Sequence, residues 1–386
     1  MINRQQAIDL LQNFLKLKSV TPETINATDF IESFFKENHF TIHRLKFSSS
    51  DSYEVDNIFA TIGSGKPHLC FAGHIDVVPP GDENAWKSPP FGAEIRNNII
   101  YGRGSEDMKG AIIASLVAVI NYLEENPSFD GKISFLLTGD EEGQAINGTR
   151  KVMEWLEKKK INIDDCIVIE PSNEKEIGDT IKVGRRGSLT CQLKVLGTQG
   201  HVAYPTKALN PIPFLITAIG SLHGNIDQGS SNFLPSNLEI TSIDVGNNAY
   251  NVIPEKAEVI FNIRFNDNWS IESLLKYIHK EFERFLNDKG LIWQVTVLAQ
   301  ADSYLTNESE LSNKLSHCIS NTKNIKPQIT TTGGTSDARF ISKYCSVIEF
   351  GLVGRSMHQV DEHVPVDEFT ELIKIYKEFL SHYYFG

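Results

Sequence analysis

The sequence predicts an α/β protein: a discontinuous domain with a mixed sheet and helices on both faces, plus an inserted α+β domain. Three observations lead to this fold class. Buried apolar strands alternate with amphipathic helical segments over residues 1–181, as in sheets with helical crossovers. Residues 182–299 follow the order βαββαβ, which is typical of a ferredoxin-like sandwich. Residues 300–386 return to the first pattern, so we expect them to complete the domain begun by residues 1–181.

The N-terminal region supplies the expected helices and strands of the larger domain. Apolar residues recur with helical spacing from Arg4 to Leu17, and Thr21-Pro22 precedes a second helix. Further helices are expected at 111–120 and 149–160. Strands are expected at 41–47, 57–62, 68–72, 131–138 and 165–170.

Ionisable side chains lie at the ends of several of these strands and helices, namely His74, Asp107, Glu141, Glu142 and Glu170. Because open α/β sheets place their sites at the carboxyl edge of the strands, we expect these side chains to gather there. Their spacing suits one ligand per βα unit and not a zinc finger, whose ligands come in close pairs. Imidazole and carboxylate together favour zinc, cobalt or manganese over magnesium or calcium.

Each of these signals has a plain structural interpretation when it is taken alone. Asp107 could cap the apolar helix that follows Gly110, since acids suit the first turn of a helix. His74 and Asp76 could belong to a surface turn, and the acids at 140–142 to a solvated loop. A metal site is favoured only because several such residues are expected at one edge of a single sheet.

The middle region, residues 182–299, has a different pattern of apolar and polar residues. Strands are expected at 182–196, 237–245, 257–265 and 293–298, with helices at 210–222 and 270–286. Arg264 lies within an expected strand, where a buried guanidinium needs an acidic partner or a ligand. His201 lies in a loop, and the residues alone favour an ordinary loop histidine.

The C-terminal region adds two further candidates for the site. The glycine-rich stretch 332–337 offers backbone N–H groups and hydroxyls to an anion. A strand at 347–352 is followed by His358, which would lie past a strand end like the earlier candidates. His363 suits a capping or surface role better. The final helix is expected at 367–382, with acids in its first turn.

Composition excludes several classes of function. The net charge of -12 over 386 residues argues against nucleic-acid and anionic-membrane partners. No apolar run reaches membrane length, and the polar N-terminus lacks the apolar region of a signal peptide. The five cysteines are scattered and include no close pair, so we expect buried thiols in a cytoplasmic protein.

Taken together, these motifs resemble the M20 family of two-zinc aminoacyl hydrolases. The resemblance covers nearly the whole chain and rests on 73–76, 104–110, 140–143, 170–171 and 356–358. The stretches 77–81, 178–189, 200–205 and 333–337 resemble most closely the members that hydrolyse N-succinyl-LL-2,6-diaminopimelate. Two alternatives are kept: an N-acetylornithine deacetylase or other aminoacylase or peptidase of the family, and a metal-dependent binding protein without catalysis.

The resemblance implies two divalent ions in each subunit, zinc with cobalt as an alternative. Asp107 would bridge both ions, and the peptide bond after it is expected to be cis. His74 and Glu170 would complete one metal site, and Glu142 and His358 the other. A shared carboxylate suits two ions held about 3.5–4 Å apart.

The resemblance also implies roles for residues that hold no metal. Asp76 would orient His74, and Glu141 would act as the general base. The protein would be a homodimer formed through the inserted domain, with His201 reaching the partner subunit's active site. Contacts to a carboxylate-rich substrate are expected from Arg185, Tyr204, Asn251, Arg264, Gly334 and Thr335.

Overall fold

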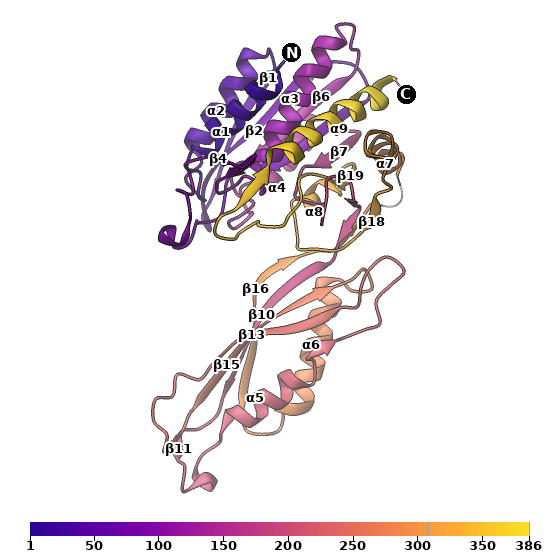
Figure 1. Ribbon diagram of the computed structural model, residues 1–386. Coiled ribbons are helices and arrows are strands. Elements are labelled where there is room, and N and C mark those ends of the chain that lie inside the picture. The colour runs from indigo at the N-terminus through magenta and orange to yellow at the C-terminus, as the bar shows by residue number, and fades with distance from the viewer. Residues whose placement is uncertain (307–308, 386) are drawn as a thin grey trace. The chain divides into compact units, whose positions relative to one another are not determined.

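The computed structural model describes residues 1–306 and 309–385, which form two compact units (Figure 1). The first unit comprises Met1–Val183, Thr306–Thr330 and Ser336–Gly386, and the second comprises Gly184–Leu305 and Thr331–Thr335. The second unit continues beyond residue 299 because β17 (Tyr304–Leu305) pairs with β9 (Gly184–Arg185). The chain thus leaves the first unit after Val183 and returns to it later.

The first unit is built on an eight-stranded mixed sheet, in agreement with the predicted fold class. Antiparallel pairs join β1 to β2 and β2 to β6, whereas β3 runs parallel to β6 and β7, and β19 runs parallel to β7. In spatial order the strands are β1 (Thr41–Ser49), β2 (Ser52–Gly63), β6 (Lys132–Thr138), β3 (His68–His74), β7 (Asp165–Val168), β19 (Ser346–Glu349), β8 (Thr180–Lys182) and β18 (Gln328–Thr330).

The parallel centre of this sheet brings distant residues to one edge. Every residue of β3 is buried, as expected for a strand covered on both faces. The register pairs His74 with Thr138 of β6, and Ala72 with Val168 of β7. The segments that follow β3, β6 and β7 therefore leave the sheet at the same edge.

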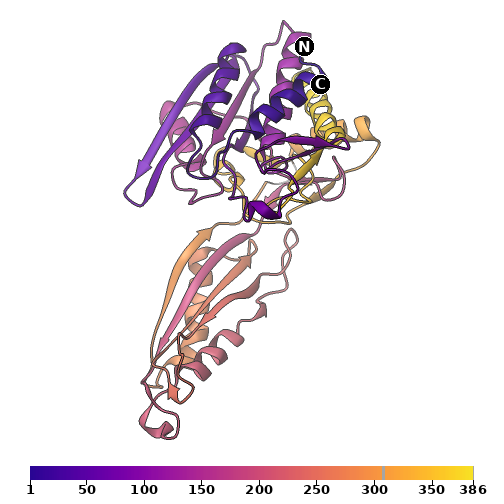
Figure 2. The ribbon, with the colours of Figure 1, turned by 60° about the vertical axis from the view of Figure 1, so that its left-hand side comes forward.

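Helices cover both faces of the large sheet, as predicted (Figures 1 and 2). On one face the Phe35 ring lies 5.4 Å from that of Phe135, and on the other the Trp155 ring lies 6.2 Å from that of Phe59. The helices of this unit are α1 (Arg4–Leu15), α2 (Ile25–Glu37), α3 (Lys109–Glu125), α4 (Thr149–Lys159), α7 (Glu310–Lys323), α8 (Ala338–Ile341) and α9 (Val366–Phe385).

A small three-stranded sheet joins the C-terminal region to the loop before α3. Its central strand β5 (Ile99–Tyr101) pairs with β4 (Glu94–Arg96) on one side and with β20 (His363–Pro365) on the other. His363 lies opposite Tyr101 in this pairing. Residues 102–107 and 356–362, which adjoin these strands, are thereby brought together.

The second unit has the strand order of a ferredoxin-like sandwich. Its antiparallel sheet runs β12 (Gly224–Asn225), β13 (Asn237–Asp244), β15 (Lys256–Phe265), β10 (Gly187–Leu196) and β16 (Ile292–Ala301). Helices α5 (Pro211–Gly220) and α6 (Ile271–Leu286) pack against this sheet.

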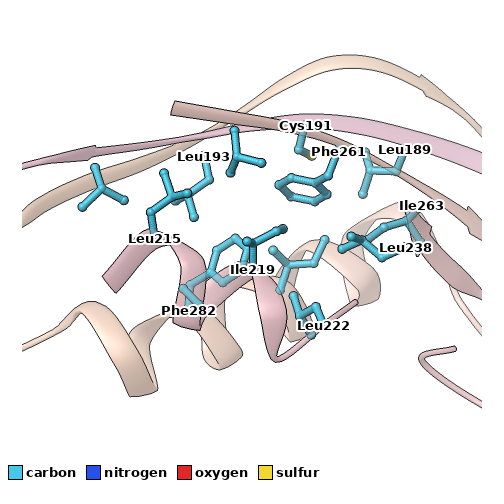
Figure 3. Close-up of a cluster of buried hydrophobic side chains, with 14 of the residues drawn as sticks. Leu189, Cys191, Leu193, Leu215, Ile219, Leu222, Leu238, Phe261, Ile263 and Phe282 are labelled. Atoms are coloured by element: carbon cyan, nitrogen blue, oxygen red, sulfur yellow. The ribbon is translucent and has the colours of Figure 1, made fainter. Parts of the chain in front are cut away.

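The core of the second unit lies between the sheet and these two helices (Figure 3). Alternate residues of β10 and β15 are buried, as the period of two in a strand requires. The ring of Phe261 on β15 meets that of Phe282 on α6 edge-on, with centroids 6.0 Å apart. This core gives the second unit a hydrophobic interior of its own.

Two predictions from composition are also tested by the structure. All five cysteines are free, and all except Cys345 are buried. Among the described residues, no helix combines the length and apolar character needed to cross a membrane.

Candidate metal centre and active site

His74 ends the central strand β3 and is 1% exposed. Its Nδ1 lies 2.9 Å from the backbone carbonyl oxygen of Asp76, to which a protonated Nδ1 donates. The opposite ring nitrogen, Nε2, lies 3.1 Å from Asp107 Oδ1 and 3.8 Å from Glu170 Oε1. The strand and this carbonyl thus direct one imidazole nitrogen toward two carboxylates, which is the usual arrangement of a metal-binding histidine.

Asp107 lies between two histidines and presents one oxygen to each. Its Oδ1 faces His74, and its Oδ2 lies 3.2 Å from His358 Nε2. The same nitrogen of His358 lies 2.9 Å from Glu142 Oε1. Each imidazole therefore faces Asp107 and one further carboxylate. The peptide bond between Asp107 and Met108 is cis, as the family resemblance implied.

The electrostatics of this group favour positive charge between the carboxylates. Burial opposes ionisation of Asp107, yet hydrogen bonds with His358 and His74 hold its pKa below the usual range. Hydrogen bonds with Asp107 and Glu142 raise the pKa of His358 to about 10. The carboxylates thus favour a positive charge at the place that the two imidazoles face.

The donor set fits divalent metal ions. The ligand atoms of His74, Asp107 and Glu142 lie within 4.8 Å of one another, as do those of His74, Glu141 and Glu170. Mixed nitrogen and oxygen donors suit zinc and its neighbours in the first transition series. By distance Glu141 belongs to the second group, whereas the family resemblance gives it a role in proton transfer.

Asp76 has a wider set of contacts than the sequence indicated. Its carboxylate is fully buried and accepts hydrogen bonds from the backbone N–H groups of Glu141 at 3.3 Å and Glu142 at 3.1 Å. Thr21 Oγ1 donates to it at 2.7 Å, while the closest distance to His74 Nδ1 is 3.6 Å. The Asp76 side chain thus holds the loop that contains Glu141 and Glu142, and the Asp76 backbone carbonyl orients His74.

Glu141 lies on the loop after β6 and is partly exposed. Burial raises the pKa of its carboxyl well above the usual range, and the nearby Glu170 carboxylate adds to the rise. A carboxyl with a raised pKa is suited to accept and return a proton near neutral pH.

The predicted residues of the second unit fall into two groups. The first lies around the short pair formed by β11 (Gly200–His201) and β14 (Val252–Ile253). His201 is exposed, its ring lies 5.6 Å from that of Tyr204, and the backbone carbonyl of Asn251 accepts a hydrogen bond from Val202.

The second group consists of arginines at the other end of β15. Burial lowers the pKa of Arg264, and the neighbouring Arg186 and Arg185 lower it further. Arg264 Nη1 is buried without a hydrogen-bond partner among the described residues. Arg185 donates to the carbonyl of Thr332 at 3.3 Å, which ties this group to the segment that contains Gly334 and Thr335.

Sequence reasoning missed two buried carboxylates beside the metal centre, Glu106 and Glu362. Glu106 lies within the motif 104–110, next to Asp107, and Glu362 lies between the two histidines considered above, His358 and His363. The available signal was the concentration of acids in these motifs. Nothing in the pattern indicated that these two side chains are buried.

Histidine and carboxylate donors at the carboxyl edge of a mixed sheet are suited to a metal-dependent hydrolase. The model of peptidase family M20/M25/M40 matches residues 70–382. The chain belongs to this family.

Known proteins resemble the chain over its full length. It is 45% identical to a succinyl-diaminopimelate desuccinylase of Rhodopseudomonas palustris strain HaA2, over 98% of this chain and 99% of the relative. It is 46% identical to a protein of the same name from Rhodospirillum centenum, over 98% of this chain and 97% of the relative.

Solved structures share the fold at lower identity. A tripeptidase from Staphylococcus aureus superposes with a TM-score of 0.82 at 19% identity, covering 98% of each chain. A dinuclear metal-binding peptidase of the M20 family from Bacillus subtilis gives a TM-score of 0.72 at 14% identity, covering 97% of each chain.

Proposed function

We propose that this chain is a metal-dependent amide hydrolase that cleaves N-succinyl-LL-2,6-diaminopimelate to succinate and LL-2,6-diaminopimelate. The reaction belongs to lysine and diaminopimelate biosynthesis. Family membership and relatives at 45% identity named succinyl-diaminopimelate desuccinylase support it. The observation that carries the chemistry is Asp107, which directs one oxygen toward His74 and the other toward His358.

Two zinc ions are the proposed cofactors, with cobalt as a substitute. His74 and Glu170 would hold one ion, Glu142 and His358 the other, and Asp107 both. Bound divalent ions polarise the scissile carbonyl and lower the pKa of bound water. The contacts among these side chains support the assignment.

Proton transfer is assigned to Glu141. Its carboxylate takes a proton from the attacking water and returns it to the nitrogen of the leaving amine. The raised pKa of this group suits both steps. Asp76 would hold Glu141 in place through the hydrogen bond that it accepts from the Glu141 backbone.

Substrate carboxylates are assigned to the arginine group of the second unit. Arg264 and Arg185 would form charge-assisted hydrogen bonds with them, with Gly334 and Thr335 on the adjoining segment. Tyr204 and Asn251 lie beside His201, which would donate a hydrogen bond to the oxyanion formed during hydrolysis.

A homodimer is proposed from the distance between these two groups. His201 pairs with Val252, just before β15, whereas Arg264 lies near the other end of that strand. The eight residue steps from Lys256 to Arg264 alone span about 26 Å. If His201 and Arg264 act at one site, they come from two copies of the chain. We therefore assign dimerisation to residues 182–299, and catalysis to 1–181 and 300–386.

A substrate comparison tests the proposed activity. The metal-loaded protein is assayed with N-succinyl-LL-2,6-diaminopimelate and with N-acetylornithine. Higher kcat/KM for the succinyl amide is expected. Preference for the acetyl amide would replace the proposal with a deacetylase, and metal binding without turnover of any acyl amide would indicate a binding protein.

Subunit exchange tests the role of His201 across the dimer. His201→Ala and Glu141→Gln proteins are each expected to be nearly inactive, whereas a mixture should regain activity. Each hybrid dimer would hold one site with both residues intact. Demonstrated exchange without recovery would contradict the cross-subunit role.

A further inference from the structure

Two loops that carry proposed metal ligands are joined by a buried carboxylate. We call residues 103–107 the aspartate loop and residues 356–363 the histidine loop. Glu362 of the histidine loop is fully buried, and its Oε1 accepts from the backbone N–H groups of Glu106 at 2.9 Å and Asp107 at 3.1 Å. Its Oε2 accepts from the N–H of Gly104 at 3.0 Å and from Arg103 Nη1 at 2.6 Å. One side chain thus orders most of the aspartate loop.

A second buried carboxylate acts in the opposite direction. Glu106 of the aspartate loop is fully buried, and its Oε2 accepts from the backbone N–H of Ser356 at 2.6 Å and from the Ser356 hydroxyl at 2.8 Å. The Ser356 Oγ in turn accepts from the N–H of His363 at 3.1 Å. Each loop therefore supplies a carboxylate that binds the backbone of the other.

Apart from the contacts of its ring with Asp107 and Glu142, His358 depends on this arrangement for its position. Its side chain is 51% exposed, so packing restrains it only weakly. Its backbone has a φ of 63°, a left-handed conformation that persists in a residue with a Cβ only where the surroundings impose it. The anchored residues Ser356 and Glu362 flank it in the chain, and Arg103 Nη2 donates to its carbonyl at 3.5 Å.

Burying the carboxylates of Glu362 and Glu106 beside the proposed metal ligands costs free energy. This cost argues against the interpretation that the two residues serve only the stability of the fold. Burying an ionised group beside other carboxylates is unfavourable unless hydrogen bonds and a counter-charge compensate. The Arg103 guanidinium and three backbone N–H groups compensate Glu362. A buried anion that accepts several N–H groups fixes the course of a loop in a way that an apolar side chain cannot.

We propose that Glu362 and Glu106 are positioning residues for metal binding, which set the separation of Asp107 and His358. The inference rests on the proposed metal-dependent function, because it concerns the same two ligands. The distance of 3.2 Å between Asp107 Oδ2 and His358 Nε2 spans the two loops. Loosening either carboxylate contact would let His358 move away from Asp107 and Glu142.

The test measures metal binding separately from turnover. Apoprotein is titrated with Co²⁺ and with Zn²⁺, and stepwise affinities are obtained by calorimetry and from the ligand-field spectrum of Co²⁺. Glu362→Gln and Glu106→Gln are each expected to weaken the weaker binding step by about 10–100-fold, as for other residues that support metal ligands. Ser356→Ala, which removes a single hydroxyl, should cost about five- to tenfold.

Asp165→Asn is the matched control. Asp165 begins β7 at the opposite end of the strand from Glu170, and it accepts a hydrogen bond from Tyr383 at 2.7 Å. This variant should bind both ions as the wild type does. Thermal unfolding of each metal-free variant shows how much of any change is a general loss of stability.

Each outcome of this test decides the proposal. Variants that lose thermal stability but bind both ions normally would reduce Glu362 and Glu106 to structural residues and overturn the inference. If Glu362→Gln does not fold, unchanged binding by Glu106→Gln and Ser356→Ala would overturn it equally. A wild-type protein that binds no pair of ions would overturn the proposed function as well, so the two failures are distinguishable.

Discussion

The two units of this protein each concentrate charge of a single sign at one place. The first gathers Glu141, Glu142 and Glu170 with Asp107 around two imidazoles, and the burial and crowding of acids raise the pKa of Glu141. The second gathers arginines, and their mutual repulsion adds to the burial that lowers the pKa of Arg264. Burial and neighbouring like charge thus disfavour the ionised form of one side chain in each group, Glu141 in the first and Arg264 in the second. This difference supports the proposal that the first group binds cations and the second binds a substrate carboxylate.

The largest expected effect comes from removing one acid without disturbing the metal ligands. Glu141→Gln should lower kcat by about 10²–10⁴-fold, because general-base assistance is lost. Metal content, measured by elemental analysis, should stay unchanged. Glu157→Gln, at an exposed site on α4, is the matched control and should retain full activity. If Glu141→Gln instead loses an ion, Glu141 is a ligand and not the base.

An intermediate effect is expected from the arginine group. Arg264→Gln should lower kcat/KM for the succinyl substrate by about 10–100-fold, mainly by raising KM, since a hydrogen bond to a charged group is lost. Arg284→Gln is the control, because Arg284 is 62% exposed and pairs with Glu281 on α6. An unchanged KM in Arg264→Gln would contradict the proposal that the arginine group binds the substrate carboxylate.

The most gradual of the expected effects is the dependence of metal affinity on pH. In the metal-free protein His358 has a pKa raised to about 10 by Asp107 and Glu142, above the ordinary value near 6.5. This proton stabilises the metal-free fold fully below about pH 6.5, and that contribution is lost as the pH rises through 10.

A metal ion must displace this proton, because only a neutral imidazole binds metal. Apparent affinity should therefore rise about tenfold per pH unit for each proton displaced, between about pH 7 and 9. Calorimetry in buffers of different ionisation enthalpy counts the protons released. Binding without proton release would show that His358 is already neutral or is not a ligand.

The sequence predicted the part of the site that lies at strand ends. His74 ends β3 and Glu170 follows β7, and the parallel pairing of these two strands could be expected from their continuous apolar runs. The contact between Asp107 and His358 could not be derived in this way. It depends on β5 and β20, two strands of three residues each, which are too short to give a periodic signal.

Asp76 illustrates a second limit of sequence reasoning. Its spacing from His74 indicated that Asp76 orients the imidazole. The spacing alone does not show whether the backbone carbonyl or the side-chain carboxylate of Asp76 makes this contact. In the structure the carbonyl contacts the ring, and the carboxylate binds the loop of Glu141 and Glu142. The helices α7 and α8 were also not predicted, and α8 spans only four residues.

The discontinuity of the first unit has a consequence for the order in which a nascent chain acquires its ligands. His74, Asp107 and Glu170 are synthesised before the second unit. His358 is synthesised only after the second unit, near the end of the chain. A chain whose translation stops within the second unit therefore exposes an acidic half-site that cannot close. The backbone of the aspartate loop is bound by Glu362, which is also synthesised late. The loop can therefore reach its final conformation only near the end of translation.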